Sequence, residues 1–196
     1  MITEKMLDLL RIKVKSYVNE RTYSHILGVE REAASLADIY LPEGERNKAR
    51  AAALLHDITK NETVEKQLQY CREFGIILGV DPLSPKLYHS KTAAVLIERD
   101  FPEFADPEIV SAVRWHTTGR DNMTVFEAII YLADYIEPGR AMDCKPHSLQ
   151  EVRIACFQNL DDGMRFALEN GISYLREQNQ PIDTISLETY EWYQKG

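Results

Sequence analysis

Four histidines and two aspartates of this 196-residue sequence lie in segments of helical periodicity, among small or apolar neighbours. Side chains three or four positions apart share one face of a helix, so this pattern directs all six polar groups towards the interior. A buried carboxylate is costly unless it is paired or bound to a metal ion. The six residues are His25, His56, Asp57, His89, His116 and Asp134.

Imidazole nitrogens and carboxylate oxygens together suit a divalent ion such as iron, manganese or zinc. Six ligands leave no open position on a single ion, whereas two ions that share Asp57 as a bridge would use them all. Helical bundles commonly hold two-metal sites between facing helices. The alternative is a set of hydrogen-bonded core histidines, with Asp134 as an anchor between helices. Because the four histidines fall on four different expected helices, the set as a whole favours a metal centre.

Helical periodicity extends along nearly the whole chain, and no segment alternates in the manner of a β-strand. The sequence therefore predicts an all-α fold, a bundle of roughly nine or ten helices in one domain over residues 1–196. The helices are expected at about 2–19, 21–40, 44–57, 61–74, 84–99, 106–117, 124–137, 148–158, 160–178 and 183–194. The expected helix-start signals are Thr59 with Glu62, Ser84 with Pro85, Asp106 with Pro107, Thr124 with Glu127, and Ser148 with Glu151.

The longest expected loop runs from Cys71 to Pro85 and is rich in glycine and proline, which predicts a rim of the active site. The net charge of −8, from 23 basic and 31 acidic side chains, disfavours nucleic acid as a partner. The longest apolar run, residues 128–133, is too short to cross a membrane, and the amphipathic N-terminal segment does not resemble a signal peptide. The three cysteines form no Cys-x-x-Cys motif. We therefore expect a cytoplasmic protein without a membrane or nucleic-acid partner.

Three short motifs carry a resemblance to a known family. With His25 before them, they follow the order seen in the HD-domain metal-dependent phosphohydrolases, and together they resemble the bacterial YqeK family. The resemblance extends over about residues 17–190. The motifs are HDITK at 56–60, WHTTG at 115–119 and ADYIEPGR at 133–140.

The resemblance implies a symmetrical bis(5′-nucleosyl)-tetraphosphatase, which hydrolyses diadenosine tetraphosphate to two ADP at a di-iron centre. It implies two divalent metal ions, iron by resemblance, with manganese or another divalent ion as the alternative. Two such ions can hold a bridging hydroxide as the nucleophile. Asp57 and Lys60 are then the expected catalytic residues. The implied ligands are His25, His56, Asp57 and Asp134 for one ion, and His89, His116 and the shared Asp57 for the other.

A tetraphosphate substrate brings about four negative charges to an acidic protein, so local cations must compensate. Lys60 and Arg140 are the candidates. Lys60 could instead complement the end of its helix, and Arg140 could form a surface ion pair. Beside His116, hydroxyl and backbone N–H groups are available for binding phosphate. They belong to Thr117, Thr118 and Gly119.

Two other functions stay open at this point. An HD-domain phosphohydrolase for a nucleoside monophosphate, a deoxynucleoside triphosphate or a cyclic nucleotide needs only the ligands of the first ion. His89 and His116 therefore favour two ions but do not fix the substrate. A catalytically inactive nucleotide sensor would be marked by a missing ligand, and none is missing. The aromatic C-terminal helix is compatible with a symmetric homodimer.

Overall fold

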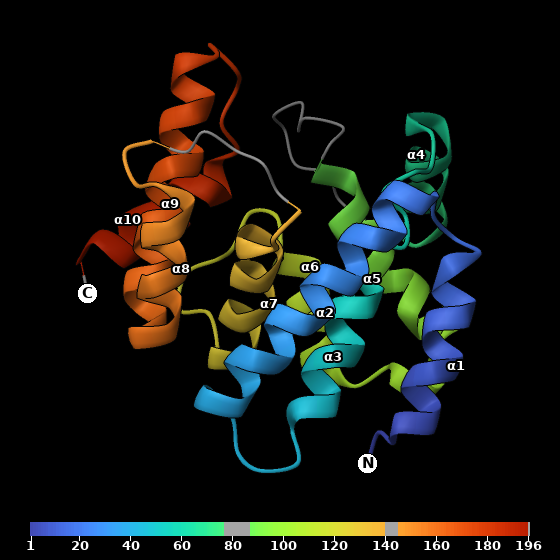
Figure 1. The fold of residues 1–196 in the computed structure, drawn as a ribbon. Helices are drawn as coiled ribbons and strands as arrows, with labels where there is room; N and C mark the ends of the chain where they lie inside the picture. The colour runs from blue at the N-terminus through green and yellow to red at the C-terminus, as the bar shows by residue number, and fades with distance from the viewer. Residues whose placement is uncertain (77–86, 140–144, 196) are drawn as a thin grey trace.

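Ten α-helices and one short 3₁₀ helix form the fold in a computed structural model, which describes residues 1–76, 87–139 and 145–195 (Figure 1). No β-strand occurs within these ranges, so the all-α prediction is confirmed. The helices are α1 (Glu4–Lys15), α2 (Glu20–Tyr40), α3 (Arg46–Leu55), α4 (Val64–Glu73), α5 (Tyr88–Asp100), η2 (Pro102–Phe104), α6 (Pro107–Trp115), α7 (Val125–Ile136), α8 (Leu149–Gln158), α9 (Leu160–Glu177) and α10 (Thr184–Lys195).

Local sequence signals set most of the helix starts. Thr124 and Ser148 form complete capping boxes with Glu127 and Glu151 at the starts of α7 and α8. Asp106 caps α6 directly before a proline in the first turn, as expected. These caps hold the N-terminal N–H groups that a helix leaves without partners.

The expected capping box of Thr59 and Glu62 is wrong, because α4 begins later and is capped by Thr63. The buried Thr59 hydroxyl instead donates to the carbonyl oxygen of His89 at 2.8 Å and lies 2.9 Å from the Thr92 hydroxyl. Thr59 thereby ties the turn after α3 to the first turn of α5. Both segments carry residues of the predicted metal centre.

Five helices surround that centre. α2 packs against α3 and α7, while α6 packs against α3, α5 and α7. Figure 1 shows α1 and α4 on one side of this group, and α8, α9 and α10 on the other. Ile26, Leu54, Leu55 and Ile129 are fully buried between these elements. The helix faces that carry the site residues therefore also form the core. Burying each such side chain contributes about 1.5–3 kcal/mol to the stability of the fold.

Two sequence predictions fall partly outside the described residues. The expected loop from Cys71 to Pro85 begins within α4, which continues to Glu73, and residues 77–86 are not described. The expected helix start at Ser84 also lies there. None of the helices in the described ranges has the length and the apolar composition needed to cross a lipid bilayer.

Candidate metal centre

The carboxylate of Asp57 lies at the middle of the site and is fully buried, two residues after the end of α3. Its Oδ2 atom lies 3.2 Å from Nε2 of His56 and 3.6 Å from Nε2 of His25. Its Oδ1 atom lies 3.1 Å from Nε2 of His89 and 3.6 Å from Nε2 of His116. One carboxylate thus divides the four imidazoles into two pairs, one facing each oxygen.

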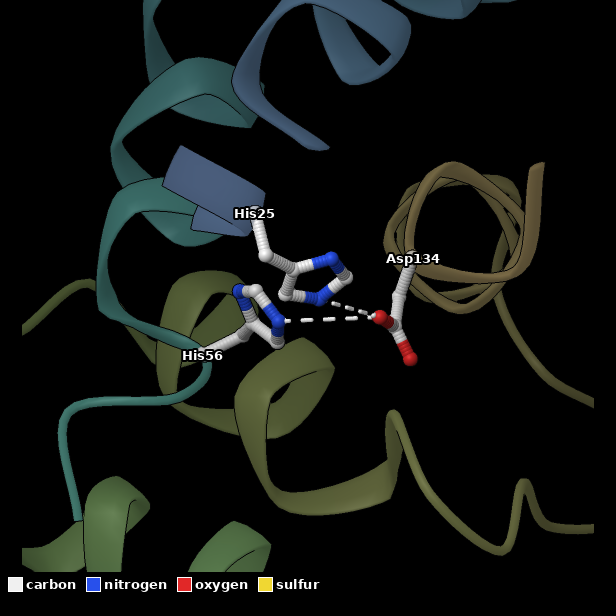
Figure 2. Close-up of side chains that lie close together, drawn as sticks. All are labelled: His25, His56 and Asp134. Carbon is white, nitrogen blue, oxygen red and sulfur yellow. Dashed lines mark ion pairs between the residues drawn. The ribbon is translucent and has the colours of Figure 1, made fainter. Parts of the chain in front are cut away.

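Asp134 approaches the first pair from α7. Its Oδ1 atom lies 2.8 Å from Nε2 of His25 and 3.8 Å from Nε2 of His56, and the three side chains point towards one another (Figure 2). His25 comes from α2 and His56 from the end of α3, so three separate elements bring these groups together. Their ligand atoms lie within 4.8 Å of one another, as do those of His56, Asp57 and His116. All six residues predicted from the sequence therefore gather at one place.

Hydrogen bonds at the outer ring nitrogens orient these histidines. Nδ1 of His56 lies 2.7 Å from the carbonyl oxygen of Ala53, and Nδ1 of His116 lies 2.7 Å from that of Val113. A carbonyl oxygen only accepts, so Nδ1 carries the proton and Nε2 presents a lone pair to the centre. Nδ1 of His25 faces a carboxylate oxygen instead. Metal-binding histidines characteristically donate their second N–H to such acceptors.

Three inward atoms show that the donor set suits a cation. Within the described ranges, Nε2 of His25, Nε2 of His56 and Oδ1 of Asp57 are buried and form no hydrogen bond. Buried acceptors without a donor cost free energy, and the cost grows when their lone pairs face one another. A divalent ion among nitrogen and oxygen donors would satisfy all three, so the residues present fit a divalent metal.

Asp57 carries a full negative charge in the interior. Burial by itself would raise the pKa of its carboxyl group. The neighbouring imidazoles of His56, His116 and His89 outweigh burial and hold this pKa well below its usual range. The centre therefore holds a fixed anion to which cations are attracted.

A proton and a metal ion would compete for Nε2 of His25. Burial disfavours its charged form, but the negative charges of the nearby Asp134 and Asp57 carboxylates, together with a hydrogen bond to Glu137, raise its pKa above 6.5. A proton on Nε2 occupies the lone pair that a metal ion would use. Metal binding at this residue therefore releases a proton and weakens as the pH falls.

A cleft of 650 Å³ opens beside His25. The ammonium group of Lys60 lies at this opening, 2.7 Å from Oδ2 of Asp57, with its side chain 39% exposed. Arg21, in the first turn of α2, provides a second cation, and Asn61 lines the cleft next to Lys60. Asn61 Oδ1 also accepts the backbone N–H of Asn19 at 2.9 Å, which joins the turn after α3 to the start of α2.

The three residues after His116 that are predicted to bind phosphate lie outside this cleft. Thr117 Oγ1 lies 3.0 Å from Ser90 Oγ, and the buried Thr118 hydroxyl donates to the carbonyl oxygen of Gly119 at 2.9 Å. Gly119, at φ +66°, ends α6 by donating its N–H to the Trp115 carbonyl oxygen at 2.8 Å. None of the three residues lines the cleft. Their contact with substrate stays a prediction.

Sequence reasoning did not single out two residues beside the centre, Arg21 and Glu137. Arg21 lies about one helical turn before His25, a spacing that places it near the same opening. Glu137 directly precedes Pro138 at the end of the helix that carries Asp134. Arg140 lies outside the described residues, so its role stays a prediction.

Known proteins are similar to this chain in sequence and in fold. Residues 22–139 match the HD domain family and include all six residues of the centre. The chain is 32% identical over 183 residues to the symmetrical bis(5′-nucleosyl)-tetraphosphatase of Bacillus subtilis, covering 93% of this chain and 95% of the relative. The protein of the same name from Halalkalibacterium halodurans is 33% identical over 177 residues, covering 90% and 91%.

The chain belongs to the HD-domain family of symmetrical bis(5′-nucleosyl)-tetraphosphatases. A solved structure agrees with this assignment. A predicted HD superfamily hydrolase involved in NAD metabolism, from Clostridium acetobutylicum, matches with a TM-score of 0.86 and 31% identity over 96% of both chains. The HD domain implies binding of a divalent metal, in agreement with the donor set found here.

Divalent ions are expected to stabilise this tetraphosphatase-family fold, because they would neutralise Asp57 and satisfy the buried lone pairs. At a hundredfold excess over Kd, manganese should raise the free energy of unfolding by about 2.7 kcal/mol. Thermal denaturation of chelator-treated protein, with and without manganese, measures this. Asp57→Ala should abolish the shift, whereas a control at an exposed position, Asp121→Ala, should keep it. An unchanged shift in Asp57→Ala would contradict the assignment.

Proposed function

We propose that this chain hydrolyses dinucleoside tetraphosphates symmetrically and cleaves diadenosine tetraphosphate to two ADP. The observation that carries this proposal is the near-full-length similarity to two relatives named for that activity. The gathering of all six predicted metal-site residues supports it. Water adds across the P–O–P link between the second and third phosphates, so one water and one tetraphosphate give two ADP and no other nucleotide.

We further propose two divalent ions, the native metal being iron, with manganese or another divalent ion as alternatives. The division of the imidazoles by the two oxygens of Asp57 supports two positions. When bound, such ions polarise the attacked phosphate and lower the pKa of the attacking water. The proposed ligands are His25, His56, Asp57 and Asp134 for one ion, and His89, His116 and Asp57 for the other.

Lys60 is the proposed catalytic cation of the chain. Its ammonium group lies where the cleft meets Asp57, so phosphate oxygens that enter the cleft come within reach of it. A fixed positive charge there opposes the repulsion between a polyphosphate and a protein of net charge −8. It also stabilises negative charge that develops on the phosphates during P–O cleavage. Arg21 adds a second positive charge at the same cleft.

Two sequence predictions concern the setting of the enzyme and not its chemistry. A cytoplasmic location and a symmetric homodimer are proposed on the grounds given above, and the site as described is built from one chain.

The products test the activity. Anaerobically purified protein, reconstituted with iron or manganese, should convert diadenosine tetraphosphate to ADP alone, as measured by anion-exchange chromatography. The appearance of AMP and ATP would contradict symmetrical cleavage. Turnover of other nucleotides without any cleavage of diadenosine tetraphosphate would favour a different HD-domain phosphohydrolase.

Removal of the Lys60 charge tests its role. Lys60→Met should lower kcat/KM about 100-fold, because one electrostatic contact to the transition state is lost. Metal content, measured by plasma mass spectrometry, should stay at the wild-type value. Lys5→Met, at an exposed position on α1, provides the matched control. Loss of metal from Lys60→Met, or full activity with metal bound, would rule out this assignment.

A further inference from the structure

Glu137 is a buried carboxylate beside the metal centre that the proposed mechanism does not use. It caps the C-terminus of α7, three residues after Asp134, and only 5% of its surface is exposed. We propose that Glu137 is a positioning residue, which fixes the tautomer of His25 so that Nε2 is free to bind metal. This inference rests on the proposed metal centre.

Each oxygen of Glu137 has its own donor. Oε2 lies 3.1 Å from Nδ1 of His25, and Oε1 accepts the backbone N–H of Gly139 at 2.7 Å. A carboxylate only accepts, so the ring proton of a neutral His25 lies on Nδ1. The lone pair on Nε2 then points towards Asp134 and Asp57, 2.8 Å and 3.6 Å away.

His25 needs a distant acceptor because of its position within a helix. His56 and His116 directly follow the ends of α3 and α6, where carbonyl groups three residues earlier are available to their Nδ1 atoms. His25 lies within α2, whose carbonyl groups are engaged in the helical hydrogen bonds. An acceptor from another element must therefore hold its ring, and Glu137 is that acceptor.

The backbone conformation at Glu137 directs its side chain towards α2. The residue before a proline is pushed out of the helical conformation, and Glu137 has φ −53° and ψ 132° before Pro138. α7 consequently ends at Ile136, and the side chain of Glu137 reaches His25 on α2. The N–H of Gly139 then closes the turn on the same carboxylate.

Two glycines provide the space that Glu137 occupies. Gly28 lies within α2, three residues after His25 and on the same side of the helix. A methyl group at Gly28 would overlap Oε1 of Glu137, and a Cβ atom at Gly139 would lie 2.9 Å from that oxygen. Since α2 is regular at Gly28, the close approach of Glu137 and not the backbone conformation requires a glycine there.

Glutamine at position 137 keeps the shape but offers one acceptor and one donor. With its oxygen accepting from Gly139, its NH₂ group donates to Nδ1 of His25. The ring proton must then move to Nε2, which blocks that atom as a ligand. The reverse orientation places the NH₂ group against the N–H of Gly139, so two donors oppose each other. The first orientation satisfies both contacts, and Glu137→Gln is therefore expected to change the tautomer.

The test compares Glu137→Gln and Gly28→Ala with a control, Gly171→Ala, which replaces a glycine of α9 that has open space around it. The first readout is the tautomer of His25 in metal-free protein at alkaline pH, from ¹⁵N chemical shifts. The second is the affinity for manganese. Circular dichroism confirms that each variant is folded.

We expect Nδ1–H in wild type and control, and Nε2–H in Glu137→Gln. Manganese binding should weaken about 10- to 100-fold in both Glu137→Gln and Gly28→Ala. An Nδ1–H tautomer with wild-type affinity in Glu137→Gln would overturn the inference. Failure of the wild type itself to bind metal would overturn the metal centre, whereas the tautomer in metal-free protein tests the hydrogen bond independently.

Discussion

A negative charge can be kept inside a protein only where other groups compensate it, and the carboxylate of Asp57 has no exposed surface. Four imidazoles and one ammonium group lie around it. These groups come from α2, the end of α3 with the turn after it, the start of α5 and the end of α6, so the convergence of these segments is needed to surround this one carboxylate. The packing of the bundle therefore determines the geometry of the site.

Carbonyl groups at helix ends orient two of the four histidine rings. A helix leaves its last carbonyl groups without partners, and His56 and His116 use them to hold their rings with Nε2 directed inwards. A histidine within a helix lacks this local acceptor. For His25, the carboxylate of Glu137 is the acceptor. Its close approach to α2 requires a glycine, Gly28, in that helix.

The helices and the inward residues could be predicted because both depend on local sequence. Apolar neighbours at helical spacing fix which face of a helix is buried, and His89 and Asp134 follow that rule. What could not be predicted depends on how the helices pack. The two oxygens of Asp57 face separate histidine pairs because α2 and the end of α3 bring His25 and His56 to one oxygen, whereas α5 and the end of α6 bring His89 and His116 to the other.

The wrong prediction at Thr59 and the position of Gly119 outside the cleft both reflect tertiary contacts, whereas the contact of Gly119 with substrate stays a prediction. Thr59 fits a capping pattern, but a tertiary hydrogen bond to α5 engages its hydroxyl. Gly119 is close to His116 in sequence, yet its positive φ accompanies a turn that packs against Thr189 of α10 and away from the cleft. The hydrogen-bond acceptor for His25 is Glu137, which lies 112 residues away in the sequence. No local sequence pattern signals such a pairing.

The central claim is that Asp57 joins two metal positions. Anomalous diffraction from crystals grown with manganese, recorded near the manganese absorption edge, tests it most directly. The account predicts two anomalous peaks, one beside each carboxylate oxygen of Asp57, with His25 and His56 at the first and His89 and His116 at the second. A single peak that involves only one histidine pair, or a peak that does not contact Asp57, would contradict it.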